Sequence, residues 1–114
     1  FENLINKIED IFWIKGLGIK CVADEPWVTV AETSECSIAF KKLGQDQIAA
    51  ELLLNAAAIV GENNVPFMGW QLEEQIYWPE EQPSWTSGAL ILAADANNKL
   101  TPASDLFTSN QFKP

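Results

Sequence analysis

The stretch QDQIAAELLLNAAAIV, at positions 45–60, decides the fold that we expect from this sequence. It is rich in alanine and leucine, which have high helix propensity, and its apolar side chains recur at the spacing of one helix face. Gly61 follows directly and provides a helix stop. Because the preceding helical segment, 29–43, also ends at a glycine, Gly44, we predict two antiparallel helices joined by one tight turn, an αα-hairpin.

Further helices are predicted on both sides of this hairpin. Residues 1–14 carry apolar side chains at spacings of three and four, which describes one face of a helix. Residues 15–28 contain glycines, a proline and β-branched residues, so we expect an irregular connection or a short strand there. After the hairpin, Ser84 caps a helix over 85–96, and Thr-Pro at 101–102 begins one more short helical turn.

Together these elements predict an all-α fold class, in which αα-hairpins pack as a layer or a partial α/α toroid. The 114 residues make one domain, and 47% of them are hydrophobic, enough to form a core. Because the chain starts at Phe1 instead of Met, we expect a single helical domain, 1–114, cut from a larger protein. The helices at 45–60 and 85–96 should be the most buried, since alanine and leucine dominate their apolar stripes.

Composition excludes several classes of function. Sixteen acidic and seven basic residues give a net charge of -9, which repels phosphate backbones and anionic lipid headgroups. We therefore expect no nucleic-acid partner and no membrane partner. The absence of histidine removes the Ser-His-Asp and Cys-His catalytic arrangements and the commonest metal ligand.

We accordingly predict no metal and no cofactor. Cys21 and Cys36 are spaced for neither a zinc site nor a CxxC motif, and whether they form a disulfide stays open.

The segment 61–83, GENNVPFMGWQLEEQIYWPEEQP, is predicted as a long loop that is unusually dense in aromatic and acidic residues. Flat aromatic faces stack on the apolar faces of sugar rings, and carboxylates accept hydrogen bonds from sugar hydroxyls. Two carboxylates flanking a glycosidic bond are also the usual hydrolytic machinery. The structural alternative is that the aromatic rings pin the loop to the helices while the glutamates are solvated.

A second group of acids lies in the first turn of the helix at 29–43, where the helix dipole also favours a carboxylate. We assign no catalytic residue. The predicted ligand-binding residues are Trp70, Glu73, Glu74, Tyr77, Trp78, Glu80, Glu81, Trp85 and, from that helix, Glu32.

Two runs of sequence resemble a known group of proteins. TVAETSECSIAFKKLGQDQIAAELL at 29–53 and, after a glycine-containing loop, YWPEEQPSWTSGALILAADA at 77–96 are similar to the closing hairpins of α/α-toroid proteins. That group includes the six-hairpin glycosidases and the prenyltransferase-like repeat proteins. The resemblance covers about residues 27–97 and implies outer and inner helices with a loop that lines a central cavity.

Three functions follow as hypotheses. The first is a carbohydrate-binding or carbohydrate-active toroid module that uses Trp and Tyr platforms and carboxylates on an oligosaccharide. If it is an enzyme, its activity would be carboxylate-dependent and glycoside hydrolase-like. The second is a non-catalytic domain whose Trp-rich loop docks on a protein partner or on the remainder of a larger chain. The third is a prenyltransferase-like, terpenoid-handling module, which needs a deep apolar cavity.

Overall fold

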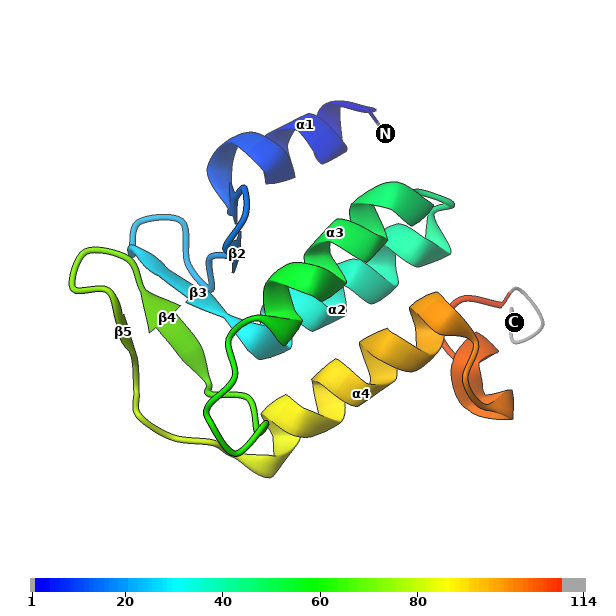
Figure 1. The fold of residues 1–114 in the computed structure, drawn as a ribbon. Helices are drawn as coiled ribbons and strands as arrows, with labels where there is room; N and C mark the ends of the chain where they lie inside the picture. The colour runs from blue at the N-terminus through cyan, green and yellow to red at the C-terminus, as the bar shows by residue number, and fades with distance from the viewer. Residues whose placement is uncertain (1, 110–114) are drawn as a thin grey trace.

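The structure is a computed structural model that describes residues 2–109, and this part contains both helices and short strands (Figure 1). In chain order the elements are α1 (Glu2–Ile11), β1 (Trp13–Ile14), β2 (Gly18–Ile19), β3 (Trp27–Thr29), α2 (Val30–Lys42), α3 (Asp46–Ala57), β4 (Gly69–Gln71), β5 (Ile76–Tyr77), α4 (Ser84–Asn98) and the 3-10 helix η1 (Pro102–Asp105).

Two antiparallel sheets make the fold mixed α/β. One pairs β1 with β2, and the other has the order β3-β4-β5. The predicted all-α fold class, with its layer or partial toroid of hairpins, is therefore wrong. Strands of two or three residues are too short to show an alternating pattern, and β3 pairs with β4 across the whole αα-hairpin. Local sequence does not report such a long-range pairing. The segment at 61–83, predicted as a loop, thus contains the β4–β5 hairpin.

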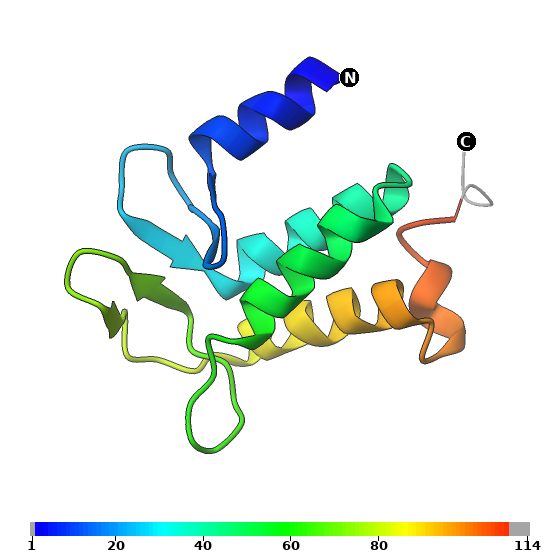
Figure 2. The same cartoon turned by 45° about the horizontal axis from the view of Figure 1, so that its top comes forward.

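The αα-hairpin is confirmed. α2 and α3 lie side by side and run in opposite directions (Figures 1 and 2). Gly44 in the turn adopts a left-handed φ of 79°, the conformation that glycine accommodates without steric cost. The N–H of Gly44 donates to the carbonyl of Lys41 at 3.0 Å, and that of Gln45 donates to Phe40 at 2.9 Å. These bonds satisfy carbonyls at the end of α2.

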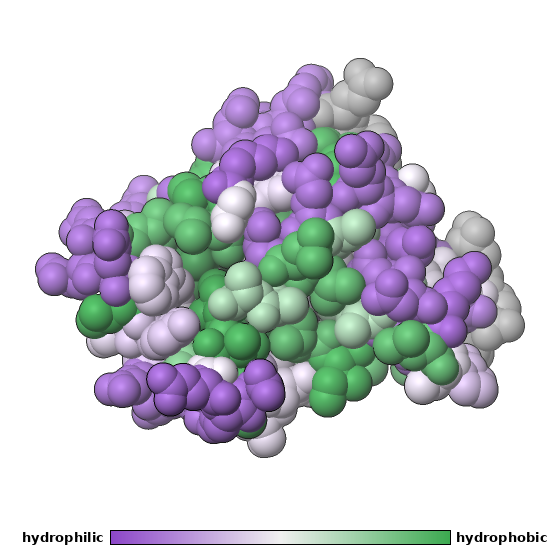
Figure 3. All heavy atoms as spheres, in the orientation of Figure 1, coloured by the Kyte–Doolittle hydropathy of each residue, from purple (hydrophilic) through white to green (hydrophobic). Residues whose placement is uncertain are grey.

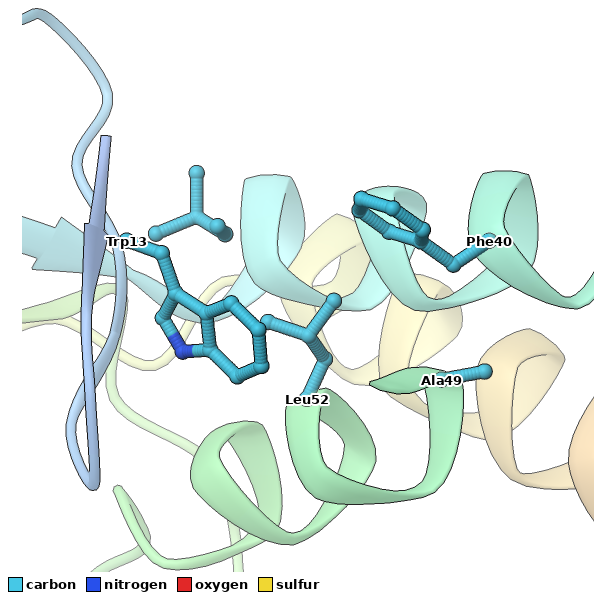
Figure 4. Close-up of a cluster of buried hydrophobic side chains, with 5 residues drawn as sticks. Trp13, Phe40, Ala49 and Leu52 are labelled. Carbon is cyan, nitrogen blue, oxygen red and sulfur yellow. The ribbon is translucent and has the colours of Figure 1, made fainter. Parts of the chain in front are cut away.

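The core has two parts, both built on this hairpin. The first joins Trp13 and Ile19 of the β1–β2 hairpin to Phe40 of α2 and to Ala49 and Leu52 of α3 (Figure 4). The second part packs the β3-β4-β5 sheet against the helices through Val28, Val30, Ala56 and Ile59.

The most buried helix is α2, which packs against both α3 and α4. Of the two helices expected to be most buried, α3 buries only Ala49, Leu52 and Ala56, and α4 likewise leaves Ile91 and Leu92 exposed. That expectation is wrong, because each of these helices has packing partners on one side only. No helix within residues 2–109 is long and apolar enough to cross a membrane.

Candidate functional site

The outward face of the β3-β4-β5 sheet is hollowed. Trp27, Gln71 and Ile76 are register neighbours across the three strands, so their side chains share this face. The loop before β3 and the turn between β4 and β5 lie side by side at the end of the molecule and extend the face (Figures 1 and 2). The resulting open hollow has a volume of about 570 Å³ and is lined by Val22, Glu25, Pro26, Trp27, Gln71, Glu74, Ile76 and Trp78.

Two indole rings form the wall of this Trp27–Trp78 hollow. They meet edge to face, with ring centroids 5.3 Å apart and planes at 78°. The Nε1–H of Trp27 donates to the carbonyl oxygen of Trp78 at 2.6 Å. This bond engages only the main chain of Trp78, and Trp78 is 51% exposed, so its indole is accessible to a ligand.

Gly69 sets the position of Trp27. Gly69 pairs with Thr29 in the same sheet, and the Nε1 edge of the Trp27 indole lies against it. A Cβ at this position would meet the Trp27 ring and would lie 2.5 Å from the carbonyl oxygen of Val28. Only glycine therefore leaves room for the edge of the indole that donates to the Trp78 carbonyl.

The polar groups of the hollow come from the β4–β5 turn and from the loop before β3. Gln71 fixes the turn, because its Oε1 accepts a hydrogen bond of 2.6 Å from the backbone N–H of Glu74. The side chains of Glu74 and Glu25 are exposed at the rim. The hollow thus offers an aromatic and aliphatic surface beside carboxylate and amide acceptors. Such a lining suits a ligand that has flat apolar faces and hydroxyl groups at its edges.

Of the residues predicted from sequence, Trp78 and Glu74 line this hollow. Trp70 and Tyr77 belong to the opposite face of the sheet, where they pack against the helices. Their rings meet edge to face at 5.1 Å, and Tyr77 also stacks on Phe67 at 4.2 Å. The Tyr77 hydroxyl donates to the carbonyl of Val60 at 3.2 Å. Both aromatic residues therefore anchor the sheet to the helices.

A second, more polar hollow of about 700 Å³ lies on that side of the sheet, and Glu80 and Tyr77 contribute to its lining. Gln82 closes it by donating from Nε2 to Asn63 Oδ1 and to the Val65 carbonyl, each at 3.0 Å. The structure thus separates Glu80 from Trp78, although only Pro79 lies between them in the sequence.

The other predicted residues line neither hollow. Glu73, Glu81 and Trp85 are exposed. Glu32 is half-buried and accepts hydrogen bonds from the Thr29 hydroxyl at 2.5 Å and from the Cys21 thiol at 3.5 Å. It therefore holds the start of α2 against the preceding loop.

Sequence reasoning missed most of the lining, including Trp27, Gln71 and Ile76. No local sequence signal places Trp27 in the lining, because it joins the hollow only through the pairing of β3 with β4.

Both cysteines are free thiols. Burial raises the pKa of Cys36, and burial together with the Glu32 carboxylate raises the pKa of Cys21. Raised pKa values disfavour the thiolate, the form that acts as nucleophile and metal ligand. Among the described residues, no group of three or more Cys, Asp or Glu side chains could hold a metal ion.

Comparison with known proteins gives one informative match. No protein-family model matches the chain. A curated relative from Mycolicibacterium hassiacum, named MMP endo-(1,4)-3-O-methyl-alpha-D-mannosidase, is 38% identical over 103 residues. The match covers 90% of this chain but 29% of the relative, so the chain spans less than a third of that protein's length. The name is that of a carbohydrate-active enzyme. The resemblance to α/α-toroid proteins remains a prediction, which this comparison does not test.

Proposed function

We propose that this chain is part of a carbohydrate-active protein and that the Trp27–Trp78 hollow binds its oligosaccharide. The observation that carries the proposal is the half-exposed Trp78 indole, held by Trp27 beside the acceptors of Gln71 and Glu74. A sugar ring would stack on the indole through its C–H face and direct its hydroxyls to these acceptors. The similarity to a mannosidase supports a sugar as the ligand.

The ligand that we propose is an α-linked manno-oligosaccharide carrying 3-O-methyl groups, the class that the relative's name contains. The lining supports this choice, because Val22, Pro26 and Ile76 provide aliphatic surface next to the indoles. A methyl ether replaces a hydroxyl that would lose its water on such a surface, so methylation lowers the desolvation cost of binding.

For the whole protein we propose endo-cleavage of such a glycan, with the hollow as a binding subsite. Glu25 and Glu74 would accept hydrogen bonds from sugar hydroxyls, since both carboxylates stand exposed at the rim. The residues that would protonate the leaving group and activate water stay unassigned.

Tryptophan fluorescence tests the proposal. The folded chain is titrated with a 3-O-methylated α-(1→4)-manno-oligosaccharide and with the same oligosaccharide unmethylated. We expect saturable binding of the methylated sugar, weakened at least about tenfold by Trp78→Ala, equivalent to about 1.4 kcal/mol. Trp85→Ala is the matched control, because Trp85 is 64% exposed but lines neither hollow. No saturable response to either sugar, or equal losses in both variants, would refute the proposal.

A further inference from the structure

The second hollow, on the helix-facing side of the sheet, has a lining that sugar binding at Trp78 leaves unused. In Figure 3 hydrophilic side chains gather at the lower left, over the loop that follows α3 and the segment that follows β5. The hollow between these segments has a volume of about 700 Å³, which is within the range of small-molecule sites, about 300–1,000 Å³. This polar hollow shares no residue with the Trp27–Trp78 hollow. The side chains that give it its character are Glu62, Asn63, Glu80 and Gln82, beside Phe67 and Tyr77.

Two carboxamides at the polar hollow hold each other in place. Asn63 Nδ2 donates to Gln82 Oε1, and Gln82 Nε2 donates in return to Asn63 Oδ1, each at 3.0 Å. Asn63 Oδ1 also accepts from the backbone N–H of Val65 at 3.2 Å, and Gln82 Nε2 donates its second hydrogen to the Val65 carbonyl at 3.0 Å. Within residues 2–109, this arrangement leaves one hydrogen on Asn63 Nδ2 and one lone pair on Gln82 Oε1 for a ligand.

Gly61 allows the polar and the apolar side of the hollow to converge. A Cβ at position 61 would lie 2.9 Å from Gln82 Nε2 and 3.0 Å from both Asn63 Oδ1 and the Phe67 ring. Phe67 in turn stacks on Tyr77, with ring centroids 4.2 Å apart. The fixed amide pair therefore lies next to a packed aromatic wall, with only a glycine between them.

The lining determines the chemical class of ligand. Glu62 and Glu80 are exposed carboxylates, and no lysine or arginine lines the hollow, so an anionic ligand would be repelled. An ammonium group cannot accept a hydrogen bond from Asn63 Nδ2, whereas a sugar hydroxyl both accepts and donates. The aromatic wall offers an apolar surface to the C–H groups of a sugar ring. A neutral sugar with free hydroxyls fits these groups best.

We propose that the polar hollow is a second saccharide site and that it takes an unmethylated mannose residue; the choice of mannose rests on the proposed function. Free hydroxyls can donate to the carboxylates and to the Gln82 amide oxygen. A methyl ether has lost its hydrogen, so it would leave one of these acceptors without a partner. The two hollows thus divide a glycan by its methylation, since the Trp27–Trp78 hollow has the more aliphatic lining.

Two-dimensional proton–nitrogen NMR tests the proposal, because it reports on each hollow separately. The folded chain is titrated with an unmethylated α-(1→4)-manno-oligosaccharide and with its 3-O-methylated counterpart. We expect the unmethylated sugar to shift the side-chain amide signals of Asn63 and Gln82 saturably, and the methylated sugar to bind there at least about fivefold more weakly. The backbone signals of 71–78 report on the Trp27–Trp78 hollow in the same spectra, so either site can fail while the other holds.

Two glutamate variants complete the test. Glu80→Ala should weaken binding of the unmethylated sugar at the polar hollow at least about fivefold, because it removes a charged acceptor. Glu81→Ala is the matched control, since Glu81 is exposed and carries the same charge but lines neither hollow. The proposal is overturned if the Asn63 and Gln82 signals do not shift, or if the two variants lose binding equally. Equal binding of both sugars at the polar hollow would also overturn it.

Discussion

Replacing Gly69 by alanine is the sharpest test of how the candidate site is built. The added methyl group would overlap the Trp27 indole and approach the Val28 carbonyl oxygen to 2.5 Å. The backbone oxygen belongs to a paired strand and has little freedom to move, so the indole must be displaced. Displacement breaks the hydrogen bond from Trp27 Nε1 to the carbonyl of Trp78.

The expected magnitude has two parts. Forcing an extra methyl group into a packed site costs about 1–3 kcal/mol, and the lost hydrogen bond adds about 1 kcal/mol. Gly69→Ala should thus lower the free energy of unfolding by about 2–4 kcal/mol. With a urea m-value of about 1.5 kcal/mol/M, the unfolding midpoint falls by about 1–3 M.

Urea unfolding followed by far-UV circular dichroism measures this change. Gly88→Ala is the matched control, because a Cβ at Gly88 has no atom within 4 Å and the residue lies inside α4. That substitution should stabilise the chain by about 0.5–1 kcal/mol through helix propensity. If Gly69→Ala unfolds at the same midpoint as the parent, the placement of Trp27 against the glycine is refuted.

Two further predictions concern buried polar groups. Thr33→Val should cost about 1–3 kcal/mol, because the buried Ile19 N–H loses the hydroxyl that accepts it at 2.9 Å, whereas Thr86→Val should be near neutral because its hydroxyl has no partner. Equal urea midpoints for the two valine variants would contradict this. The raised pKa values of Cys21 and Cys36 predict slow labelling by a disulfide reagent at pH 7. The protonated thiols contribute fully to the free energy of unfolding below the unfolded thiol pKa of about 8.5. This contribution is lost as the pH rises through the higher pKa values of the folded chain. If the thiols react as fast in the native chain as in urea, the prediction of slow labelling is refuted.

Local signals predicted the helices, because the spacing of apolar side chains that indicates a helix lies within consecutive residues. The predicted cap was wrong, since Ser84 is the first residue of α4 and Pro83 precedes it. The 45–60 stretch and Gly44 specify α3 and the turn before it without reference to the rest of the chain. The observed α3 ends at Ala57, earlier than predicted, because Val60 pairs with Pro66 in an isolated bridge. Such a bridge depends on chain that folds back, which periodicity does not describe.

The candidate site was harder to predict, for the same reason. Density of aromatic and acidic residues pointed to 61–83, and Trp78 and Glu74 from that segment do line the hollow. Strand alternation, however, turns Tyr77 and Trp78 to opposite sides, so neighbours in sequence serve different surfaces. Trp27 joins the hollow only because β3 pairs with β4, a contact between segments separated by the αα-hairpin.

Because β3 pairs with β4, the chain could be divided into two fragments that reassemble. A single cut in the exposed turn at Gly44 would divide the chain between α2 and α3, yet the β3–β4 ladder and the α2–α3 packing would still join the halves. The first half would bring Trp27 and the second Gln71 and Trp78, so neither alone would contain the hollow. Recovery of ligand binding on mixing the halves would then report their reassembly.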